Sequence, residues 1–361
     1  MEITVEKCPS NADNRQAKIS TILASGDKNI DLISVNDEMI SEFKHKGYLE
    51  PLEKNVMTEE VRDSFPQKYL ESICEENGHI YSVPFQMDIM MFWVNQELLK
   101  QAGLDEIKNT GDFDILQKSL KNPDQYAYGD AWENTHVYNS LSQFVNFWGG
   151  DYFDWTDPKT KDAARYMKSM LDEKNTSPAQ FVDQYEQMEE KFIRGKYGCV
   201  FMYTSALGTF LDADVYGKNK IHMAPLPVLH KKKATNIATW QYVLNNASEN
   251  KDAAVRFLQY AAGYEGSTEY AKIMKSYPAR VDVIENEDID LEGIDMIRKY
   301  LREYTLNARP LCENSMGAVS EYGKNLFQGY VLGQCEEDSF FEQAQKLYKY
   351  LLLKRHLRMS F

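Results

Sequence analysis

Paired carboxylates are side chains whose type suits acid–base chemistry, and the sequence contains adjacent glutamates. Two examples, Glu75-Glu76 and Glu189-Glu190, lie in segments predicted to be helical, where neighbouring side chains diverge, whereas acid–base catalysis needs carboxyl groups that converge on one bond. Both pairs therefore predict solvated helix faces. The six histidines and five cysteines have no H-E-x-x-H, CxxC or other metal-ligand spacing, and no nucleophile elbow or phosphate-binding loop occurs. The sequence thus predicts no catalytic residue, no metal site and no cofactor.

Composition and charge narrow the class of protein. The 361 residues suffice for two domains or one large one, and 43% hydrophobic with 27% charged residues is ordinary globular composition. With 41 basic and 55 acidic residues the formal net charge is −14, which disfavours binding to nucleic acid or to anionic membranes. No apolar run is long enough to predict a membrane span, and the opening MEITVEKCPS lacks the basic and apolar regions of an export signal.

The elements that would position a site alternate between strands and helices. A β-type run at 3–5, an amphipathic helix at 15–25 and a continuously apolar run at 30–35 predict a βαβ unit whose second strand is buried and parallel. Further strands are predicted at 80–85, 87–94, 197–203 and 237–245, and further helices at 96–102, 161–172, 187–193 and 250–262. From residue 290 onward the sequence predicts a mostly helical chain. The predicted fold class is therefore α/β with a helical C-terminal end.

Several segments, in order along the chain, carry a resemblance to a known family. They are ILASGDKNIDLISVND (22–37), FKHKGYLEPLE (43–53), GHIYSVPFQMDIMMFWVNQELLKQAGLD (78–105), EEKFIRGKYGCVFMYTSALG (189–208), SENKDAAVRFLQYAAGYEGSTEYAK (248–272), YPAR (277–280) and NARP (307–310). In wording and order they resemble the family 1 extracellular solute-binding proteins of ABC importers, the group that includes maltose-binding proteins.

The resemblance implies a type II periplasmic-binding-protein-like fold, in which two α/β lobes joined by several crossings close like a hinge on a ligand held between them. Lobe one is expected to comprise residues 1–125 and 239–306, and lobe two residues 126–238 and 307–361. The resemblance further implies a non-enzymatic protein that captures a mono- or oligosaccharide for the membrane permease subunits of an ABC importer. It is expected to be extracellular or periplasmic, and tethered to the membrane through an N-terminal segment that is removed or missing here.

The resemblance also guides the choice of site residues. Ligands in open α/β sheets bind beyond the carboxyl ends of strands, so polar and aromatic side chains just past predicted strand ends are candidate carbohydrate contacts. Together with residues that the resemblance places at the lobe crossings, before the Gly149-Gly150 turn and in the YPAR loop, the candidates are Asp37, Gln86, Asp88, Trp132, Glu133, Trp148, Tyr203, Trp240, Tyr277 and Arg280. Structural alternatives are helix N-capping for Asp37, a solvated loop for Gln86 and Asp88, and a core position for either Trp132 or Trp148. Trp240 is the leading candidate, because an indole near a crossing is available to stack on a sugar ring.

One departure and three alternatives accompany this hypothesis. The family begins with a strand and a long helix ahead of the segment that aligns with residues 3–5, and this leading unit is absent from the sequence. We therefore expect an unpaired gap or edge beside the strands at 3–5 and 30–35, with lower stability and association through that edge.

The alternative functions are the same fold binding a peptide or polyamine, an enzyme such as a glycoside hydrolase, and an N-terminally truncated product that binds no ligand.

Overall fold

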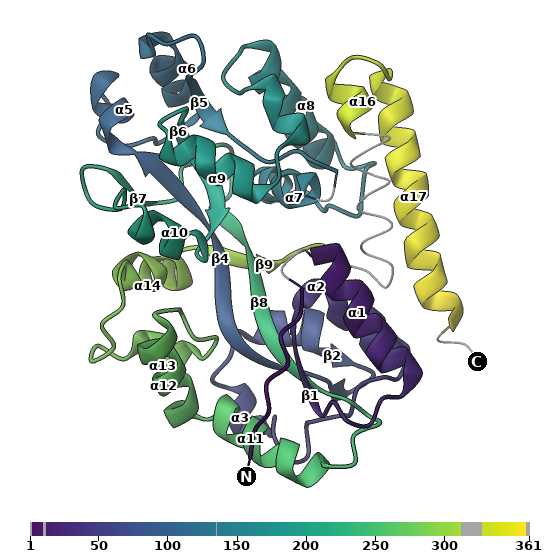
Figure 1. Ribbon diagram of the computed structural model, residues 1–361. Helices are drawn as coiled ribbons and strands as arrows, with labels where there is room; N and C mark the ends of the chain where they lie inside the picture. The colour runs from purple at the N-terminus through teal and green to yellow at the C-terminus, as the bar shows by residue number, and fades with distance from the viewer. Residues whose placement is uncertain (1, 10–11, 135, 312–326, 359–361) are drawn as a thin grey trace. The chain divides into compact units, whose positions relative to one another are not determined.

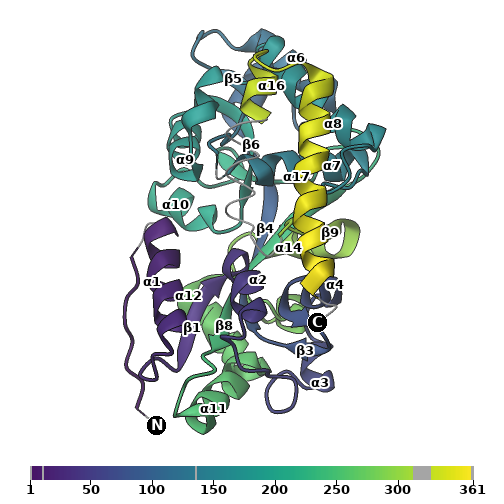
Figure 2. The same ribbon diagram turned by 90° about the vertical axis from the view of Figure 1, so that its right-hand side faces the viewer.

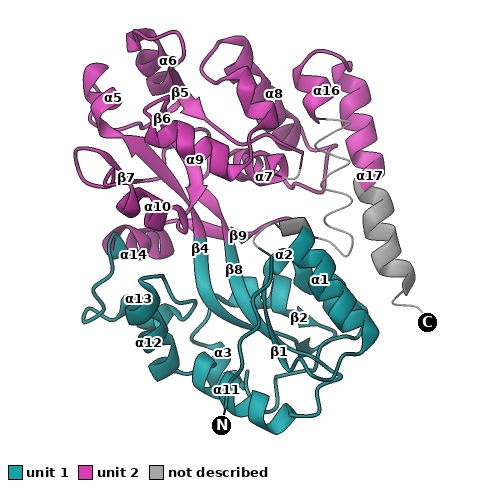
Figure 3. Cartoon of the chain, in the orientation of Figure 1, with its two compact units in different colours: residues 1–88, 238–294 teal, residues 89–237, 295–361 magenta. Residues whose placement is uncertain are grey.

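The computed structural model describes residues 2–9, 12–134, 136–311 and 327–358. The chain forms two compact units, unit 1 with residues 1–88 and 238–294 and unit 2 with residues 89–237 and 295–361 (Figure 3). It passes from one unit to the other three times, inside the long strands β4 (Val83–Asn95) and β8 (Ala234–Leu244) and at the start of α14 (Ile294–Glu303). Each unit is therefore assembled from segments that lie far apart in the sequence.

Unit 1 contains the sheet order β1, β8, β4, in which β1 (Leu32–Asn36) is the terminal strand among those described. β1 runs antiparallel to β8, and Asn36 lies opposite Trp240. Helices α1 (Ala12–Ser25) and α2 (Asp37–His45) pack against each other (Figure 2). The other elements of unit 1 are α3 (Glu59–Arg62), α4 (Gln67–Tyr69), the π-helix η1 (Leu70–Cys74), β2 (Glu75–Glu76), β3 (His79–Ile80), α11 (Lys251–Ala262), α12 (Tyr264–Met274) and α13 (Val281–Glu285) (Figure 1).

Unit 2 is built around β6 (Tyr197–Tyr203), which is buried along its whole length. β6 pairs parallel with β5 (Tyr126–Gly129) and antiparallel with β4, which also pairs with β7 (Ile221–Ala224), while β9 (Thr305–Ala308) lies parallel to the start of β8. Its helices are α5 (Gln96–Gln101), α6 (Thr110–Ser119), α7 (Val137–Trp148), α8 (Pro158–Asp172), the 3-10 helix η2 (Pro178–Val182), α9 (Tyr185–Ile193), α10 (Ala206–Asp212), α16 (Gln328–Val331) and α17 (Glu337–Arg358), besides α14 (Figure 1).

Local sequence signals explain where the helices of unit 2 begin and end. Asp157 caps α8 by accepting a hydrogen bond from the backbone N–H of Lys159 at 2.9 Å, and Pro158 occupies the first turn, where its missing N–H costs nothing. Helix α7 ends at Gly149, whose φ of 73° is the left-handed conformation that glycine adopts without strain. These signals agree with the predicted α/β class, which the structure confirms.

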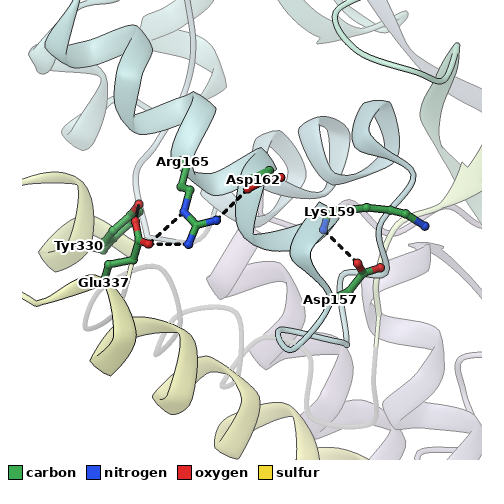
Figure 4. A network of polar contacts seen from close by, with 6 residues as sticks. All are labelled: Asp157, Lys159, Asp162, Arg165, Tyr330 and Glu337. Carbon is green, nitrogen blue, oxygen red and sulfur yellow. Dashed lines mark hydrogen bonds and ion pairs between the residues drawn. The ribbon is translucent and has the colours of Figure 1, made fainter.

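The C-terminal helix α17 is joined to α8 by a polar network and by aromatic packing. The Arg165 guanidinium donates to the Glu337 carboxylate, with 2.9 Å from Nε to Oε1, and also to Asp162 (Figure 4). The Tyr330 hydroxyl donates to the second Glu337 oxygen at 2.9 Å. The Tyr330 ring stacks on Phe340 with centroids 4.6 Å apart. The mostly helical C-terminal end predicted from the sequence is thus anchored to unit 2.

Most of the predicted elements are present. The predicted helices correspond to α1, α5, α8, α9 and α11, and the strand predicted at 197–203 coincides with β6. The two strands predicted at 80–85 and 87–94 are largely one continuous strand, β4. Glu75 and Glu76 lie on β2 rather than on a helix, because the preceding π-helix ends at Cys74 and the chain turns back into β3.

The N-terminal predictions need correction. Residues 3–5 form no strand, and Ile3 and Val5 are 58% and 86% exposed, since no described strand pairs with them. The strand predicted at 30–35 is present as β1, but it is antiparallel and alternates in burial. The parallel βαβ unit was therefore wrong. Apolar continuity at 30–35 indicated a strand, but the partner of that strand is β8, about 200 residues away, and its direction depends on how the chain returns.

The unit boundaries differ from the predicted lobe boundaries at the first passage. Residues 89–125, predicted for lobe one, lie in unit 2, because β4 pairs from Met90 onward with β6 and from Phe92 onward with β7. The second passage falls at 237/238 and the third at 294/295, beside the predicted 238/239 and 306/307. None of the helices in the described part of the chain is both long and apolar enough to cross a membrane.

Candidate functional site

A pocket of about 130 Å³ opens in unit 2 where β6 ends and α10 begins. The chain turns from the strand into the helix within two residues, and α9 packs against β6 and contributes residues to the same pocket. The pocket is lined by Tyr185 and Glu189 of α9, by Met202 and Tyr203 of β6, and by Ser205, Ala206 and Thr209 at the start of α10. Two phenol rings, two aliphatic hydroxyls and one carboxylate therefore surround a small volume. Such a set can stack on an apolar face and exchange hydrogen bonds with hydroxyl groups.

Tyr203, one of the predicted contacts, is fixed in place from behind. Its hydroxyl donates to the side-chain oxygen of Asn139 at 2.9 Å, and the Arg309 guanidinium lies over its ring, 5.6 Å from the centroid. Arg309 in turn donates to the Tyr138 hydroxyl at 3.0 Å. Both Asn139 and Arg309 are buried. The ring at the end of β6 is therefore held in one orientation, which lowers the entropy lost when a ligand binds.

Glu133, a second predicted contact, is linked to the same pocket through two residues that the sequence did not single out. Its carboxylate lies 3.2 Å from Nδ1 of His136, whose ring meets Tyr185 edge to face at 4.8 Å. Tyr185 meets Tyr203 edge to face at 6.0 Å. Glu133 and Tyr203, which are 70 positions apart, are thus brought into one cluster. An aromatic residue at the start of a helix that leads into the β6 strand was the available signal for Tyr185.

Glu189 gives the pocket its charge. Its Oε1 is buried and has no hydrogen-bond partner among the described residues. Burial raises the pKa of Glu189, the Thr209 hydroxyl opposes that shift, and the nearby Glu186 adds to it. Glu190, by contrast, pairs with Arg194 at 2.5 Å, one helical turn along. The prediction of a solvated helix face is confirmed for Glu190 and wrong for Glu189, because successive residues on a helix point in different directions.

The two tryptophans predicted in unit 2 do not line this pocket. Trp132 is fully buried, packs against Phe181 and Phe327, and donates from Nε1 to Asp130 at 2.9 Å. Trp148, at the end of α7, is also buried and stacks on His230 with centroids 4.8 Å apart. Both indoles therefore occupy the core positions that the sequence left open as the alternative.

In unit 1, Asp37 is the first residue of α2 and is fully buried. The N-cap position belongs to Asn36. The Asp37 carboxylate accepts a hydrogen bond from the Tyr69 hydroxyl at 3.1 Å, and that hydroxyl accepts from Thr239 at 2.8 Å and Gln241 at 3.0 Å. Gln241 extends the network, because its side-chain oxygen accepts from Ser82 and from the Cys74 thiol. Asp37 thus belongs to a buried polar network that ties α2 to β8.

The other candidates of unit 1 also have protein partners. The Arg15 guanidinium of α1 lies over the Trp240 indole, 5.3 Å from the ring centroid. Gln86 accepts a hydrogen bond from the Tyr270 hydroxyl at 2.7 Å. On the same strand, Asp88 is buried. Trp240 and Gln86 are partly exposed, and so keep surface that a ligand could contact.

Tyr277 and Arg280, from the YPAR loop, hold neighbouring segments of unit 1. The Tyr277 hydroxyl donates to the backbone carbonyl of Glu292. The buried Arg280 guanidinium makes a two-pronged contact with Asp282, at 3.0 and 2.6 Å, and donates to the Ala262 carbonyl and the Ser64 hydroxyl. These bonds occupy much of the donor capacity of the guanidinium. Within the described ranges, no group of three or more His, Cys, Asp or Glu side chains is arranged to hold a metal ion.

Comparison with known proteins decides the family. The family model "Bacterial extracellular solute-binding protein" matches residues 4–268, which is more than half of the chain. The protein belongs to this family. Membership agrees with the order of segments noted in the sequence and with the two units of α/β structure.

Individual members of the family are distant in sequence. The "Probable amino-acid ABC transporter periplasmic-binding protein y4oP" of Sinorhizobium fredii is 24% identical over 239 residues, 63% of this chain and 54% of that protein, so the chain spans about half the length of this relative. The "Arabinooligosaccharide-binding protein" of Halalkalibacterium halodurans is 22% identical over 342 residues, 87% of this chain and 75% of that one. The solved structure "Maltose bound T. maritima MalE3" superposes with a TM-score of 0.79 at 18% identity, covering 95% of this chain and 90% of the other. This last likeness establishes the two-lobed solute-binding fold.

Proposed function

We propose that the protein captures a carbohydrate outside the cytoplasmic membrane, delivers it to the permease subunits of an ABC importer and catalyses no reaction. The observation that carries the proposal is the unit 2 pocket, where the rings of Tyr185 and Tyr203 accompany hydroxyl and carboxylate oxygens. A sugar presents an apolar C–H face beside a ring of hydroxyls, so it needs this pairing of aromatic and polar groups. Family membership and the sugar-binding names of two relatives support the same conclusion.

We assign the family's two lobes to units 1 and 2. The predicted contacts that retain the strongest support are Tyr203 and Glu133, joined by Tyr185, Glu189 and Ser205 of the pocket. In unit 1, Trp240 and Gln86 are partly exposed and remain proposed ligand contacts. For the remaining predicted residues we propose a supporting role, because their polar groups are engaged inside the protein or their side chains are buried. They are Asp37, Asp88, Trp132, Trp148, Tyr277 and Arg280.

Calorimetric titration with a panel of neutral mono- and oligosaccharides, including maltose and arabinooligosaccharides, tests the proposal. We expect at least one member to bind, and Tyr185→Ala to weaken its binding by about 1–3 kcal/mol, because the variant removes an aromatic wall of the pocket. Tyr260→Ala is the matched control, since this tyrosine of α11 is 51% exposed and does not line the pocket. It should leave affinity unchanged.

Three outcomes would overturn the proposal. Heat from peptides or polyamines, with none from any saccharide, would favour the same fold serving another solute. Recovery of a chemically altered sugar after long incubation would indicate an enzyme. Equal losses of affinity in Tyr185→Ala and Tyr260→Ala would show that sugar binding does not depend on this pocket.

A further inference from the structure

We propose that Glu189 makes the unit 2 pocket selective for ligand charge, so that it admits neutral and amino sugars and excludes sugars that carry a carboxylate. The inference rests on the proposed function, because it names which sugars the same site accepts. It assigns a specificity-determining role to a residue that the sequence pattern had placed on a solvated helix face.

The position of Glu189 is the first argument. Among the seven lining residues it is the one with a formal charge, and the other polar groups there are the hydroxyls of Tyr185, Tyr203, Ser205 and Thr209. Arg309 lies over the Tyr203 ring and donates to the Tyr138 hydroxyl, but it does not line the pocket. None of the described residues that line the pocket therefore carries a positive charge that could compensate a second negative charge.

The second argument is the bonding of the carboxylate. The Thr209 hydroxyl is near enough to Glu189 to oppose the rise that burial causes in the pKa of its carboxyl, while Oε1 is buried and has no partner in the part of the chain that the structure describes. A buried carboxylate oxygen without a donor is unfavourable by itself, and a ligand hydroxyl or ammonium group would satisfy it with a charge-assisted bond. Burial also raises the pKa of Glu189, which is the shift that a donating ligand would reverse.

These two arguments fix the direction of selectivity. A hydroxyl donates to Oε1, an ammonium group donates and also neutralises the charge, and a carboxylate can only place a like charge in a partly dehydrated pocket. Like charges brought together in such surroundings repel strongly, because little water remains to screen them. We therefore expect amino sugars to bind at least as well as neutral ones, and uronic acids to bind at least about tenfold more weakly.

The test uses the whole chain and matched sugars. D-Glucose, D-glucosamine and D-glucuronate, with the corresponding galactose series and the oligosaccharides of the neutral panel, are titrated at pH 7.5 into the wild type and into Glu189→Gln. Glu190→Gln is the control, since it makes the same charge change on the adjacent residue, which pairs with Arg194. Glu189→Ala provides a second variant should the glutamine form fold poorly, and thermal melting verifies folding in every case.

The expected result is that Glu189→Gln reduces the penalty on uronates by about tenfold or more and removes any preference for the amine, while Glu190→Gln keeps the wild-type pattern. Neutral sugars binding no better than uronates in the wild type would overturn the inference, as would an unchanged ratio in Glu189→Gln. So would equal changes in both variants, which would reflect net charge alone. If no saccharide of any charge binds, the proposed function falls and the inference with it, whereas saccharide binding without charge selectivity overturns the inference alone.

Discussion

Each unit buries one aspartate at the end of a strand, and the two carboxylates are satisfied in different ways. Asp130 directly follows β5 in unit 2, and Asp37 directly follows β1 in unit 1. The donors to Asp130 all lie within ten residues along the chain: Tyr128, Ala131, Trp132 and Ser140. The network of Asp37 instead runs through Tyr69 to Thr239, which is 170 residues further along.

This difference separates two ways of building a buried polar site. The site of Asp130 can form as soon as a short stretch of chain folds, and its four donors compensate most of the cost of burial. Even so, burial raises the pKa of Asp130 in spite of the hydrogen bonds from Ser140, Tyr128 and Trp132. The site of Asp37 exists only after both segments of unit 1 have come together. The hydrogen bonds of Asp130 therefore stabilise a short stretch of chain, whereas those of the Asp37 network form only when the two segments of unit 1 have assembled.

The largest expected effect is at Asp130. Asp130→Ala would leave buried donors without an acceptor, and we expect it to lower the free energy of unfolding by about 3–5 kcal/mol in urea denaturation. Asp130→Asn should cost less, because it keeps the shape and one acceptor. The control is Asp295→Ala. The Asp295 side chain is 94% exposed, so this substitution should change the free energy of unfolding by less than about 0.5 kcal/mol. Similar losses in Asp130→Ala and in this control would refute the account of the cluster.

A smaller effect is expected at Tyr69. Tyr69→Phe removes the hydroxyl that joins Asp37 to Thr239 and Gln241, and we expect a loss of about 1–3 kcal/mol. Tyr260→Phe, at an exposed position, should be neutral. A double-mutant cycle of Tyr69→Phe with Asp37→Asn should show a coupling energy of at least about 0.5 kcal/mol. Strict additivity would mean that the two residues do not act as one network.

The smallest expected loss of stability is at Glu337, a partly exposed carboxylate that contrasts with the two buried aspartates. Hydrogen bonding to Arg165 lowers the pKa of Glu337, with Tyr330 and Lys161 acting in the same direction against the effect of burial. A lowered folded-state pKa stabilises the protein above the unfolded-state pKa, and that contribution disappears as pH falls through the folded value. We expect Glu337→Gln to cost less than about 1 kcal/mol at pH 7, and the cost to shrink as the pH is lowered through the folded-state pKa of Glu337, as measured by urea denaturation. A cost that does not fall as the pH is lowered would contradict the electrostatic explanation.

Elements with local causes were predictable from the sequence. Helix α8 has its cap, its proline and its amphipathic period within one stretch, and β6 is an uninterrupted apolar run. The direction of β1 was not predictable. Its partner β8 follows about 200 residues later, after the first segment of unit 2, and no local signal in the sequence indicates how the chain returns. The first passage between units falls at 88/89 rather than at the predicted lobe boundary of 125/126, and β4 shows no break in apolar pattern that would mark it in the sequence.

The residues of the candidate site likewise include some that the sequence predicted and some that it did not. A rule about strand ends selected Tyr203, which does line the pocket, whereas Trp132, chosen at a predicted crossing, and Trp148, chosen for the Gly149-Gly150 turn, are buried in the core. Strand ends are visible in a sequence, but the direction of a side chain after the turn is not. Glu189 was missed because its role depends on which face of α9 meets β6, and that is set by tertiary packing.

The discontinuity of unit 1 has a consequence for synthesis on the ribosome. β1 is complete at Asn36, but its partner residue Trp240 follows about 200 residues later, which at 5–20 residues per second is a delay of about 10–40 seconds. During that interval the strand that pairs with β1 does not yet exist, whereas β4, β5, β6 and β7 are synthesised before it. A holdase chaperone that occupies residues 32–36 during this interval would protect the nascent chain from aggregation.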